Sequence, residues 1–167
     1  MKQIGLLSDT HGHLHPKVFE FFADCDEVWH AGDIGGNNVA EELSKFKPFK
    51  AVYGNIDGQS IRSVYPKDLR FYCEKVDVWI THIGGYPGKY DKLVKDEIHA
   101  NPPKLFICGH SHILKVMPDK KLNLLFMNPG AAGISGFHKV ITLLKFCITE
   151  NKIHDLKVME LPKASSL

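Results

Sequence analysis

The first third of the chain alternates short apolar runs with segments of helical periodicity, and this alternation restricts the fold more than any other feature. Apolar runs at residues 3–7, 27–30 and 49–53 predict three strands. Pro16 opens a segment with helical spacing at 17–23, and Asn37 or Asn38 can cap a second helix over 39–43. A β-α-β-α-β order indicates parallel strands joined by helical crossovers.

The remainder of the chain is dominated by strands. Only Glu74-Lys75 separates apolar runs at 69–73 and 76–81, which predicts a hairpin. A helix is expected over 90–99, followed by strands at 105–108, 113–117, 122–127, 140–149 and 153–160, with no further helix. The predicted fold is therefore α/β, with two mixed sheets packed as a sandwich and flanked by helices in four layers (αββα).

Length and composition fit one globular domain. The chain has 167 residues, of which 44% are hydrophobic and 24% charged, and we expect a domain over 1–162 and a short tail over 163–167. No apolar run reaches the roughly 18 residues of a membrane span. A net charge of +2 gives no strong signal for nucleic acid.

Cysteine usage and the start of the chain predict a cytoplasmic protein. The cysteines form no C-x-x-C pair, and they are interpreted as buried free thiols in a reducing compartment. They are Cys25, Cys73, Cys108 and Cys147. The polar residue Asp9 interrupts the first apolar run too early for a signal peptide.

Polar residues follow five of the apolar runs, each in a loop that contains glycine. They are Asp9, His11, Asp33, Asn55, His82, His110 and His112. Any one of them alone is more often an ordinary turn or loop residue. Their repetition in five loops favours a shared site, because the carboxyl ends of parallel strands lie on one edge of a sheet and ligand sites form there.

The residue types in these loops point to a pair of metal ions. Carboxylates and imidazoles without cysteine suit manganese, iron, cobalt or zinc, and seven ligands exceed one tetrahedral site. Asp9 and His11, like His110 and His112, are two residues apart, so in an extended backbone both side chains would point to one side. Two ions about 3.5–4 Å apart would form a clamp for in-line attack at phosphorus.

The ordered motifs resemble those of the calcineurin-like metallophosphoesterase superfamily, in particular its small prokaryotic YfcE-type phosphodiesterase branch. The motifs are D-x-H at 9–11, G-D at 32–33, G-N-x-D at 54–57, T-H at 81–82, G-H-x-H at 109–112 and Asn128-Pro129-Gly130. The resemblance implies a β-sandwich flanked by helices and a hydroxide that bridges two metals and attacks phosphorus. It also implies one ion at Asp9, His11, Asp33 and His112, and another at Asp33, Asn55, His82 and His110, with Asp33 bridging. Mn²⁺ is the expected ion, with Ni²⁺, Zn²⁺, Fe and Co²⁺ as alternatives.

One position departs from the family pattern. Many members carry a histidine directly after the motif asparagine, where this chain has Ile56. An apolar side chain cannot protonate a leaving group, so His13 is a candidate substitute, and Asp57 is expected either to orient a ligand or to form a turn. We therefore expect a small phosphate-ester substrate and a preference for diesters.

Two other functions compete with this hypothesis. The resemblance also extends to a retromer subunit that uses the fold as a protein-interaction scaffold, but all seven ligand positions are retained here. A serine hydrolase would use Ser111 with a neighbouring histidine, but the chain lacks a G-x-S-x-G elbow around it. Relatives in the family often self-associate, so the resemblance leaves a homo-oligomer open, and the sequence does not fix the oligomeric state.

Overall fold

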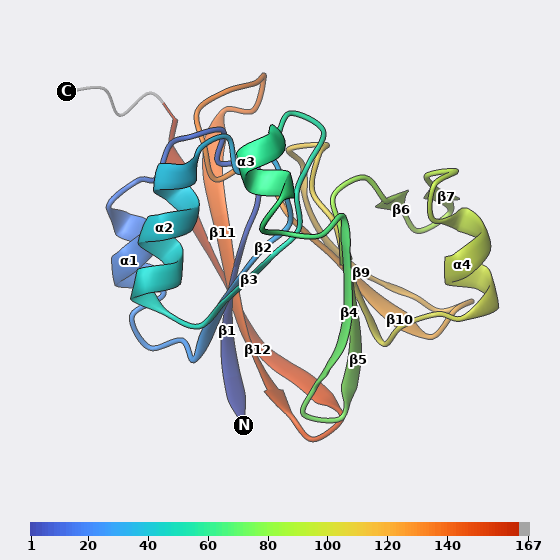
Figure 1. Ribbon diagram of the computed structural model, residues 1–167. Helices are drawn as coiled ribbons and strands as arrows, with labels where there is room; N and C mark the ends of the chain where they lie inside the picture. The colour runs from blue at the N-terminus through green and yellow to red at the C-terminus, as the bar shows by residue number, and fades with distance from the viewer. Residues whose placement is uncertain (164–167) are drawn as a thin grey trace.

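Two five-stranded sheets pack face to face in the computed structural model, which describes residues 1–163 (Figure 1). The first sheet has the order β12-β11-β1-β2-β3 and the second has the order β4-β5-β8-β10-β9. The first contains β1 (Lys2–Leu7), β2 (Glu27–His30), β3 (Phe49–Ala51), β11 (Val140–Thr149) and β12 (Lys152–Pro162). The second contains β4 (Asp68–Cys73), β5 (Val76–Thr81), β8 (Leu105–Ile107), β9 (Leu114–Asp119) and β10 (Leu124–Pro129).

Both sheets are mixed, as predicted. Strands β1, β2 and β3 are parallel, which confirms the interpretation of the β-α-β-α-β order, and β11 joins β1 in the antiparallel sense. In the second sheet, β5, β8 and β10 are parallel, and the edge strands β4 and β9 are antiparallel to their neighbours. The carboxyl ends of the parallel strands in each sheet therefore lie on one edge of that sheet.

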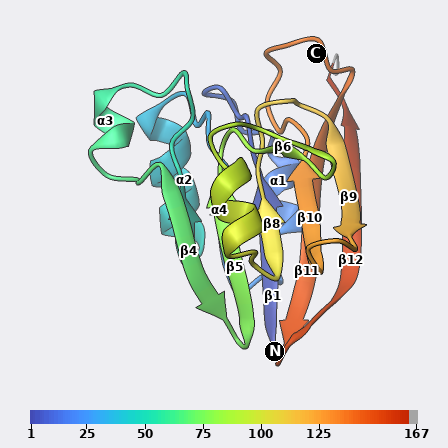
Figure 2. The same ribbon diagram turned by 90° about the vertical axis from the view of Figure 1, so that its right-hand side faces the viewer.

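Helices cover the outer faces of the sandwich (Figures 1 and 2). Helices α1 (Lys17–Phe21) and α2 (Asn37–Phe46) lie on the first sheet, and α4 (Lys95–Ala100) lies on the second. A single turn, α3 (Gln59–Arg62), follows β3. The four layers predicted from the sequence are confirmed.

Three apolar clusters fill the spaces between these layers. In β8, Leu105 and Ile107 face the other sheet, whereas Phe106 faces outward and packs with Val94 and Ile98 beside α4. Because both faces of such strands are covered, their sequences are continuous apolar runs, which is why they could be found without the structure.

The structure corrects two local predictions. The helix expected over 90–99 is shorter, because residues 85–90 form the small hairpin of β6 (Gly85–Tyr86) and β7 (Lys89–Tyr90), and α4 begins only at Lys95. Neither Asn37 nor Asn38 caps α2. Its N-cap is Gly36, and the Asn38 amide instead donates to the Gly12 carbonyl at 3.4 Å.

Other predictions are tested only in part. All four cysteines are buried and free, as expected. Strand β12 ends at Pro162, whereas residues 164–167 of the predicted tail lie outside the described residues, so the domain boundary stays a prediction. Within residues 1–163, no helix is both long and apolar enough to cross a membrane.

Candidate metal centre

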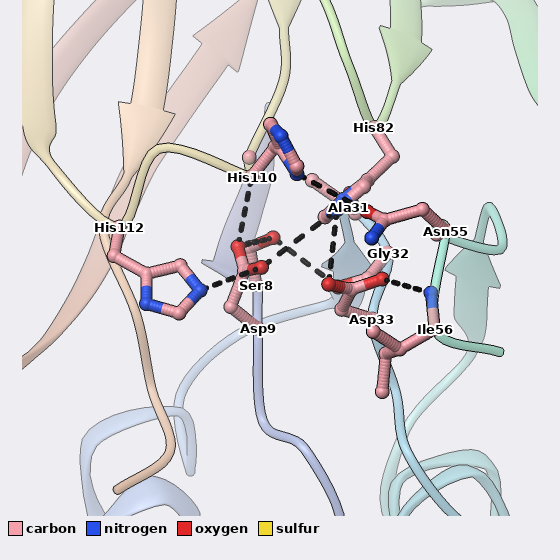
Figure 3. A network of polar contacts seen from close by, with 12 residues as sticks. Ser8, Asp9, Ala31, Gly32, Asp33, Asn55, Ile56, His82, His110 and His112 are labelled. Atoms are coloured by element: carbon pink, nitrogen blue, oxygen red, sulfur yellow. Dashed lines mark hydrogen bonds and ion pairs between the residues drawn. The ribbon is translucent and has the colours of Figure 1, made fainter. Parts of the chain in front are cut away.

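The seven predicted ligands meet at the edge where the two sheets face each other, and Figure 3 labels these residues apart from His11. The first sheet supplies Asp9 and His11 after β1, Asp33 after β2 and Asn55 after β3. The second sheet supplies His82 after β5, and His110 and His112 after β8. The site is therefore built at the junction of the two sheets.

The ligands divide into two groups. Asp9, His11 and His112 form one group with ligand atoms within 4.8 Å of one another, and Asp33, His82 and His110 form the other. Asn55 belongs to the second group, because its Oδ1 lies 3.1 Å from Nδ1 of His110. The two groups contain the residues of the two sets that the motifs imply, and their role as metal ligands stays a prediction.

Asp33 lies between the two groups. Its Oδ2 is 3.2 Å from Nε2 of His82 and 3.4 Å from Nε2 of His11. Its other oxygen, Oδ1, accepts a hydrogen bond from the backbone N–H of Ile56 at 3.1 Å. One carboxylate oxygen thus faces ligands of both groups while the other fixes the side chain.

Asp9 is fixed in a similar way. Its Oδ2 accepts hydrogen bonds from the Ser8 hydroxyl at 2.7 Å and from the backbone N–H of His110 at 3.1 Å. Its Oδ1 faces Nε2 of His112 at 3.2 Å (Figure 3). The backbone contact from His110 also ties the first sheet to the second at this point.

Three buried polar atoms at the centre of the site have no hydrogen-bond partner within residues 1–163: Asp9 Oδ1, His11 Nε2 and His82 Nε2. A buried polar atom without a partner costs about 1–3 kcal/mol, so native proteins rarely keep several of them together. All three atoms carry lone pairs that suit a divalent cation. These residues therefore fit a metal site.

The backbone at the ligands is not extended, and the spacing argument from the sequence was wrong on this point. Asp9, His11, His110 and His112 have φ angles of 54°, 46°, 71° and 63°, and Asp33 has 56°. These angles lie in the left-handed region, which residues other than glycine adopt rarely, in tight turns or at functional sites. Sharp local turns, rather than the alternation of a strand, direct these side chains to the centre.

Two glycines allow close approach of the loops. A Cβ on Gly54 would overlap Oδ1 of Asp33, and a Cβ on Gly109 would overlap the Ser8 hydroxyl. The glycine of the Gly-His-Ser-His motif therefore lets its loop pack against the loop after β1.

Charge at the site favours ionised carboxylates. Burial by itself raises the pKa of Asp9, but the nearby imidazoles of His11 and His112, together with the Ser8 hydroxyl, outweigh it and hold the pKa well below the ordinary value. Burial also raises the pKa of Asp33 by itself, but His82 and the hydrogen bond from the Ile56 N–H outweigh it and lower the pKa. Both side chains are thus anionic near neutral pH and ready to bind cations.

Comparison with known proteins identifies the family. A family model described as the calcineurin-like phosphoesterase superfamily domain matches residues 1–151. The chain belongs to the calcineurin-like phosphoesterase superfamily. This confirms the resemblance carried by the five strand-end motifs, and the family supports a metal-dependent phosphoesterase that binds divalent ions.

The chain is similar to one curated protein along its sequence and to two solved structures in its fold. A protein named as a phosphodiesterase from Methanocaldococcus jannaschii is 28% identical and is matched over 99% of its length and 95% of this chain. The crystal structure of a Vps29 variant from Entamoeba histolytica is 16% identical, with a TM-score of 0.73 over 96% of this chain and 98% of that one. A structure described as a novel archaeal phosphodiesterase is 23% identical, with a TM-score of 0.76 over 95% of this chain and 99% of that one.

The superfamily's Asn-Pro-Gly turn has a clear local role here. The Asn128 amide donates to the Gly109 carbonyl at 3.0 Å and to the Ser111 hydroxyl at 3.1 Å. The Ser111 oxygen also accepts from the N–H of Ile113 at 3.1 Å. Within the described residues, Ser111 makes no hydrogen bond with a histidine, so the geometry does not support a serine nucleophile.

The two predicted catalytic residues outside the ligand set lie differently. The Asp57 carboxylate is buried and accepts three backbone hydrogen bonds, from Ile34 at 3.1 Å and from Gly35 and Gly54 at 2.8 Å. It therefore orients the loops that carry Asp33 and Asn55 rather than acting on substrate. The His13 side chain has no hydrogen bond or ion pair within residues 1–163, so a role as proton donor stays a prediction.

Sequence reasoning missed His138, which follows none of the five apolar runs that mark the predicted ligands. Its Nε2–H donates to the Gly133 carbonyl at 2.7 Å, and its ring packs edge-on against His112 with centroids 5.2 Å apart. Its Nδ1 is buried without a partner among the described residues. No motif marks this histidine, because only the loop after β10 brings it to the ligands.

Proposed function

We propose that this protein is a dinuclear metal-dependent phosphodiesterase, with Mn²⁺ as the expected ion. The proposed ligands are Asp9, His11, Asp33 and His112 for one ion, and Asp33, Asn55, His82 and His110 for the other. The observation that carries this proposal is the position of Asp33 Oδ2, which lies 3.2–3.4 Å from histidine nitrogens of both groups. A single shared oxygen of this kind is what a bridging carboxylate requires.

When bound, two divalent ions would acidify a water molecule and neutralise charge on the phosphoryl oxygens during in-line displacement. The chain prepares the ligands for this role. His82 Nδ1 lies 2.8 Å from the Ala31 carbonyl, so its N–H donates there and Nε2 keeps its lone pair. Asn55 is neutral where a third carboxylate would reduce the positive charge available to an anionic substrate.

The preference for diesters follows from Ile56. This side chain is 47% exposed beside the ligands and offers no proton to a departing alkoxide. Esters whose leaving group is weakly basic, such as aryl diesters, need that proton least. Simple alkyl monoesters need it most and should react slowly.

Metal reconstitution tests the proposal. The protein would be stripped with a chelator, reloaded with Mn²⁺, Ni²⁺, Zn²⁺ or Mg²⁺, and assayed on bis(4-nitrophenyl) phosphate, 4-nitrophenyl phosphate and an alkyl monoester. We expect activity to return with about two ions per chain and to be highest on the diester. Full activity with one ion would contradict the dinuclear centre, and faster hydrolysis of the alkyl monoester would contradict the diester preference.

A protein-interaction scaffold is the second candidate, and the similarity of the fold to a Vps29 favours it. The three partnerless ligand atoms favour the enzyme instead, because a scaffold has no need to bury them. Hydrolysis of none of these esters by the metal-loaded protein would support the scaffold.

A further inference from the structure

A cavity of about 270 Å³ opens beside the candidate metal centre. Asn55 and His82, both proposed ligands, form one end of it. The cavity is therefore continuous with the place where a scissile phosphate would bind, and its other residues can contact the groups that this phosphate carries.

Arg62 lines the cavity, and several contacts hold its side chain in place. Its Nε donates to the Asp57 carbonyl at 2.6 Å, and its Nη2 donates to the Asn55 carbonyl at 3.3 Å. The guanidinium also stacks on the ring of Tyr53, with its Cζ 4.5 Å from the centroid. The carbonyl groups and the ring that contact Arg62 are all neutral. Nη1 of Arg62 donates no hydrogen bond within residues 1–163, so the guanidinium is held in place while its positive charge stays available to an anion.

Lys67 supplies a second cation. It is exposed, and within the described part of the chain it forms no ion pair. Asp68 is the one acid in the cavity lining, and its Oδ1 already accepts a hydrogen bond from the Trp79 indole at 2.9 Å. With histidine neutral, Arg62, Lys67 and Asp68 give the lining a net charge of +1.

The apolar part of the cavity wall includes Ile83, Leu93 and Val94. Such a wall suits the flat face of a base or the carbon face of a sugar. The volume is just below the range of about 300–1,000 Å³ that is typical of sites for drug-sized ligands. The space therefore suits one sugar- or ring-sized unit with its charged substituent.

We propose that this cavity binds a second phosphate group, carried on the sugar or ring next to the scissile diester. The substrate class is thus a nucleotide-like diester with an additional terminal phosphate, which Arg62 and Lys67 bind. This inference rests on the proposed function, because it specifies which diesters the same centre takes.

A matched pair of probes tests the inference. Thymidine 5′-(4-nitrophenyl phosphate) and its 3′-phosphorylated counterpart share one leaving group and differ by a single phosphate. We expect kcat/KM to be about tenfold higher for the 3′-phosphorylated probe. Lys67→Gln should bring the ratio of the two values towards one, whereas Lys45→Gln, an exposed lysine on α2, should leave the ratio unchanged.

Binding measurements separate failure of the inference from failure of the proposed function. Calorimetry on the metal-loaded protein would compare thymidine 3′,5′-bisphosphate with thymidine 5′-phosphate. Tighter binding of the bisphosphate that Lys67→Gln abolishes would support the cavity assignment even if neither probe is hydrolysed. Equal kcat/KM values together with equal binding would overturn the assignment while leaving the phosphodiesterase in place.

Discussion

Asp57 shows how a single side chain can set the geometry of two loops. Its carboxylate accepts the N–H groups of Ile34, Gly35 and Gly54, and these residues flank Asp33 and Asn55. Both oxygens are used as acceptors. A side chain of the same shape with only one acceptor oxygen cannot replace it.

Asp57→Asn is therefore expected to destabilise the protein by about 1–3 kcal/mol, because its amide would face a backbone N–H in a buried place. Metal affinity should fall about 10–100-fold as the loops loosen. Urea unfolding and calorimetric metal titration measure the two effects. Glu42→Gln, an exposed change on α2, should alter neither, and an Asp57→Asn protein with unchanged metal affinity would contradict the positioning role.

His138 is expected to support the metal ligands around Asp9. His138→Ala removes the ring that packs against His112, so His112 gains rotamer freedom that metal binding must then restrict. We expect about tenfold weaker binding at one of the two ions, measured as a change in one phase of a calorimetric titration. His99→Ala on α4 is the matched control, and equal weakening in both variants would rule the support out.

His30 is a buried histidine held in one tautomer. Its Nδ1 accepts from the Gly32 N–H at 3.1 Å, and its Nε2 lies 3.0 Å from the Thr10 hydroxyl, which donates to the Ile34 carbonyl. Protonation of Nδ1 would break the bond from Gly32. Burial lowers the pKa of His30 from 6.5 to about 4, so the folded protein excludes a proton that the unfolded chain binds between these values.

The stability that His30 contributes is complete above about pH 6.5 and is lost as the pH falls towards 4. Between pH 7.5 and 4.5 the chelator-treated wild type should lose about 2.5 kcal/mol more unfolding free energy than His30→Gln, which cannot titrate. Urea denaturation at both pH values measures this. Parallel losses in the two proteins would show that His30 does not titrate as described.

The residues that the structure brings together at the candidate site could be found one by one from the sequence, whereas the residues that surround and position them could not. Asp9, His82 and the other ligands follow apolar runs directly, so residue type and strand end together mark them. Arg62 and His138 reach the site through loops whose course depends on tertiary contacts, and nothing in their local sequence indicates it. The left-handed backbone at Asp9 and His110 was missed because spacing alone cannot distinguish a strand from a tight turn.

Among the elements, the packing of α1 on β1 is set by a glycine. A Cβ on Gly5 would lie 2.6 Å from the ring of Phe22, which is fully buried at the end of α1. The absence of a side chain at position 5 thus lets the helix approach the sheet. The sequence predicted both elements but not this contact.

Gly5→Ala should cost about 1–3 kcal/mol, because the ring or the helix must move. Phe22→Leu in the same chain should recover part of this loss, since the smaller side chain leaves room for the new methyl group. Urea unfolding of the single and double variants measures the coupling. At Gly58 a Cβ meets nothing within 4 Å, so Gly58→Ala should cost less than about 1 kcal/mol.

The bounds of helices and strands were predicted correctly where the segments were mainly apolar. They were wrong where glycines with positive φ angles turn the backbone. Strands β2, β5 and β11 have the predicted bounds, because burial on both faces leaves segments in which apolar residues predominate. The helix expected over 90–99 begins only at Lys95, because the residues before it form a hairpin in which Gly85 and Gly88 have φ angles of 73° and 91°. Tyr90, expected in that helix, instead ends β7 and donates to Asp119 at 2.7 Å.

On the scale of the whole molecule, the metal centre joins the two sheets. Asp9, Asp33 and Asn55 come from the first sheet, and His82 and His110 come from the second. An ion bound to ligands of both sheets must be released before the sheets separate. Metal binding should therefore stabilise the entire fold rather than one loop.

Mn²⁺ at 100 times its Kd should add about 2.7 kcal/mol to the free energy of unfolding, if the unfolded chain binds no metal. For a chain of this size the Tm should rise by about 5–10 °C, which differential scanning fluorimetry measures. Asp33→Asn, which weakens ligation in both groups, should show a much smaller rise. An unchanged Tm in the wild type would argue against ligation across the sheets.

The position of β1 has a consequence for synthesis in the cell. This strand lies inside the first sheet, and Lys2 pairs with Ile148 while Leu6 pairs with Leu144. A nascent chain can form the β1–β2 pair early, but one edge of β1 has no partner until residues 140–149 have left the ribosome. An exposed apolar edge of this kind attracts other chains. Translation speed and chaperone access should thus govern how much newly made protein escapes aggregation.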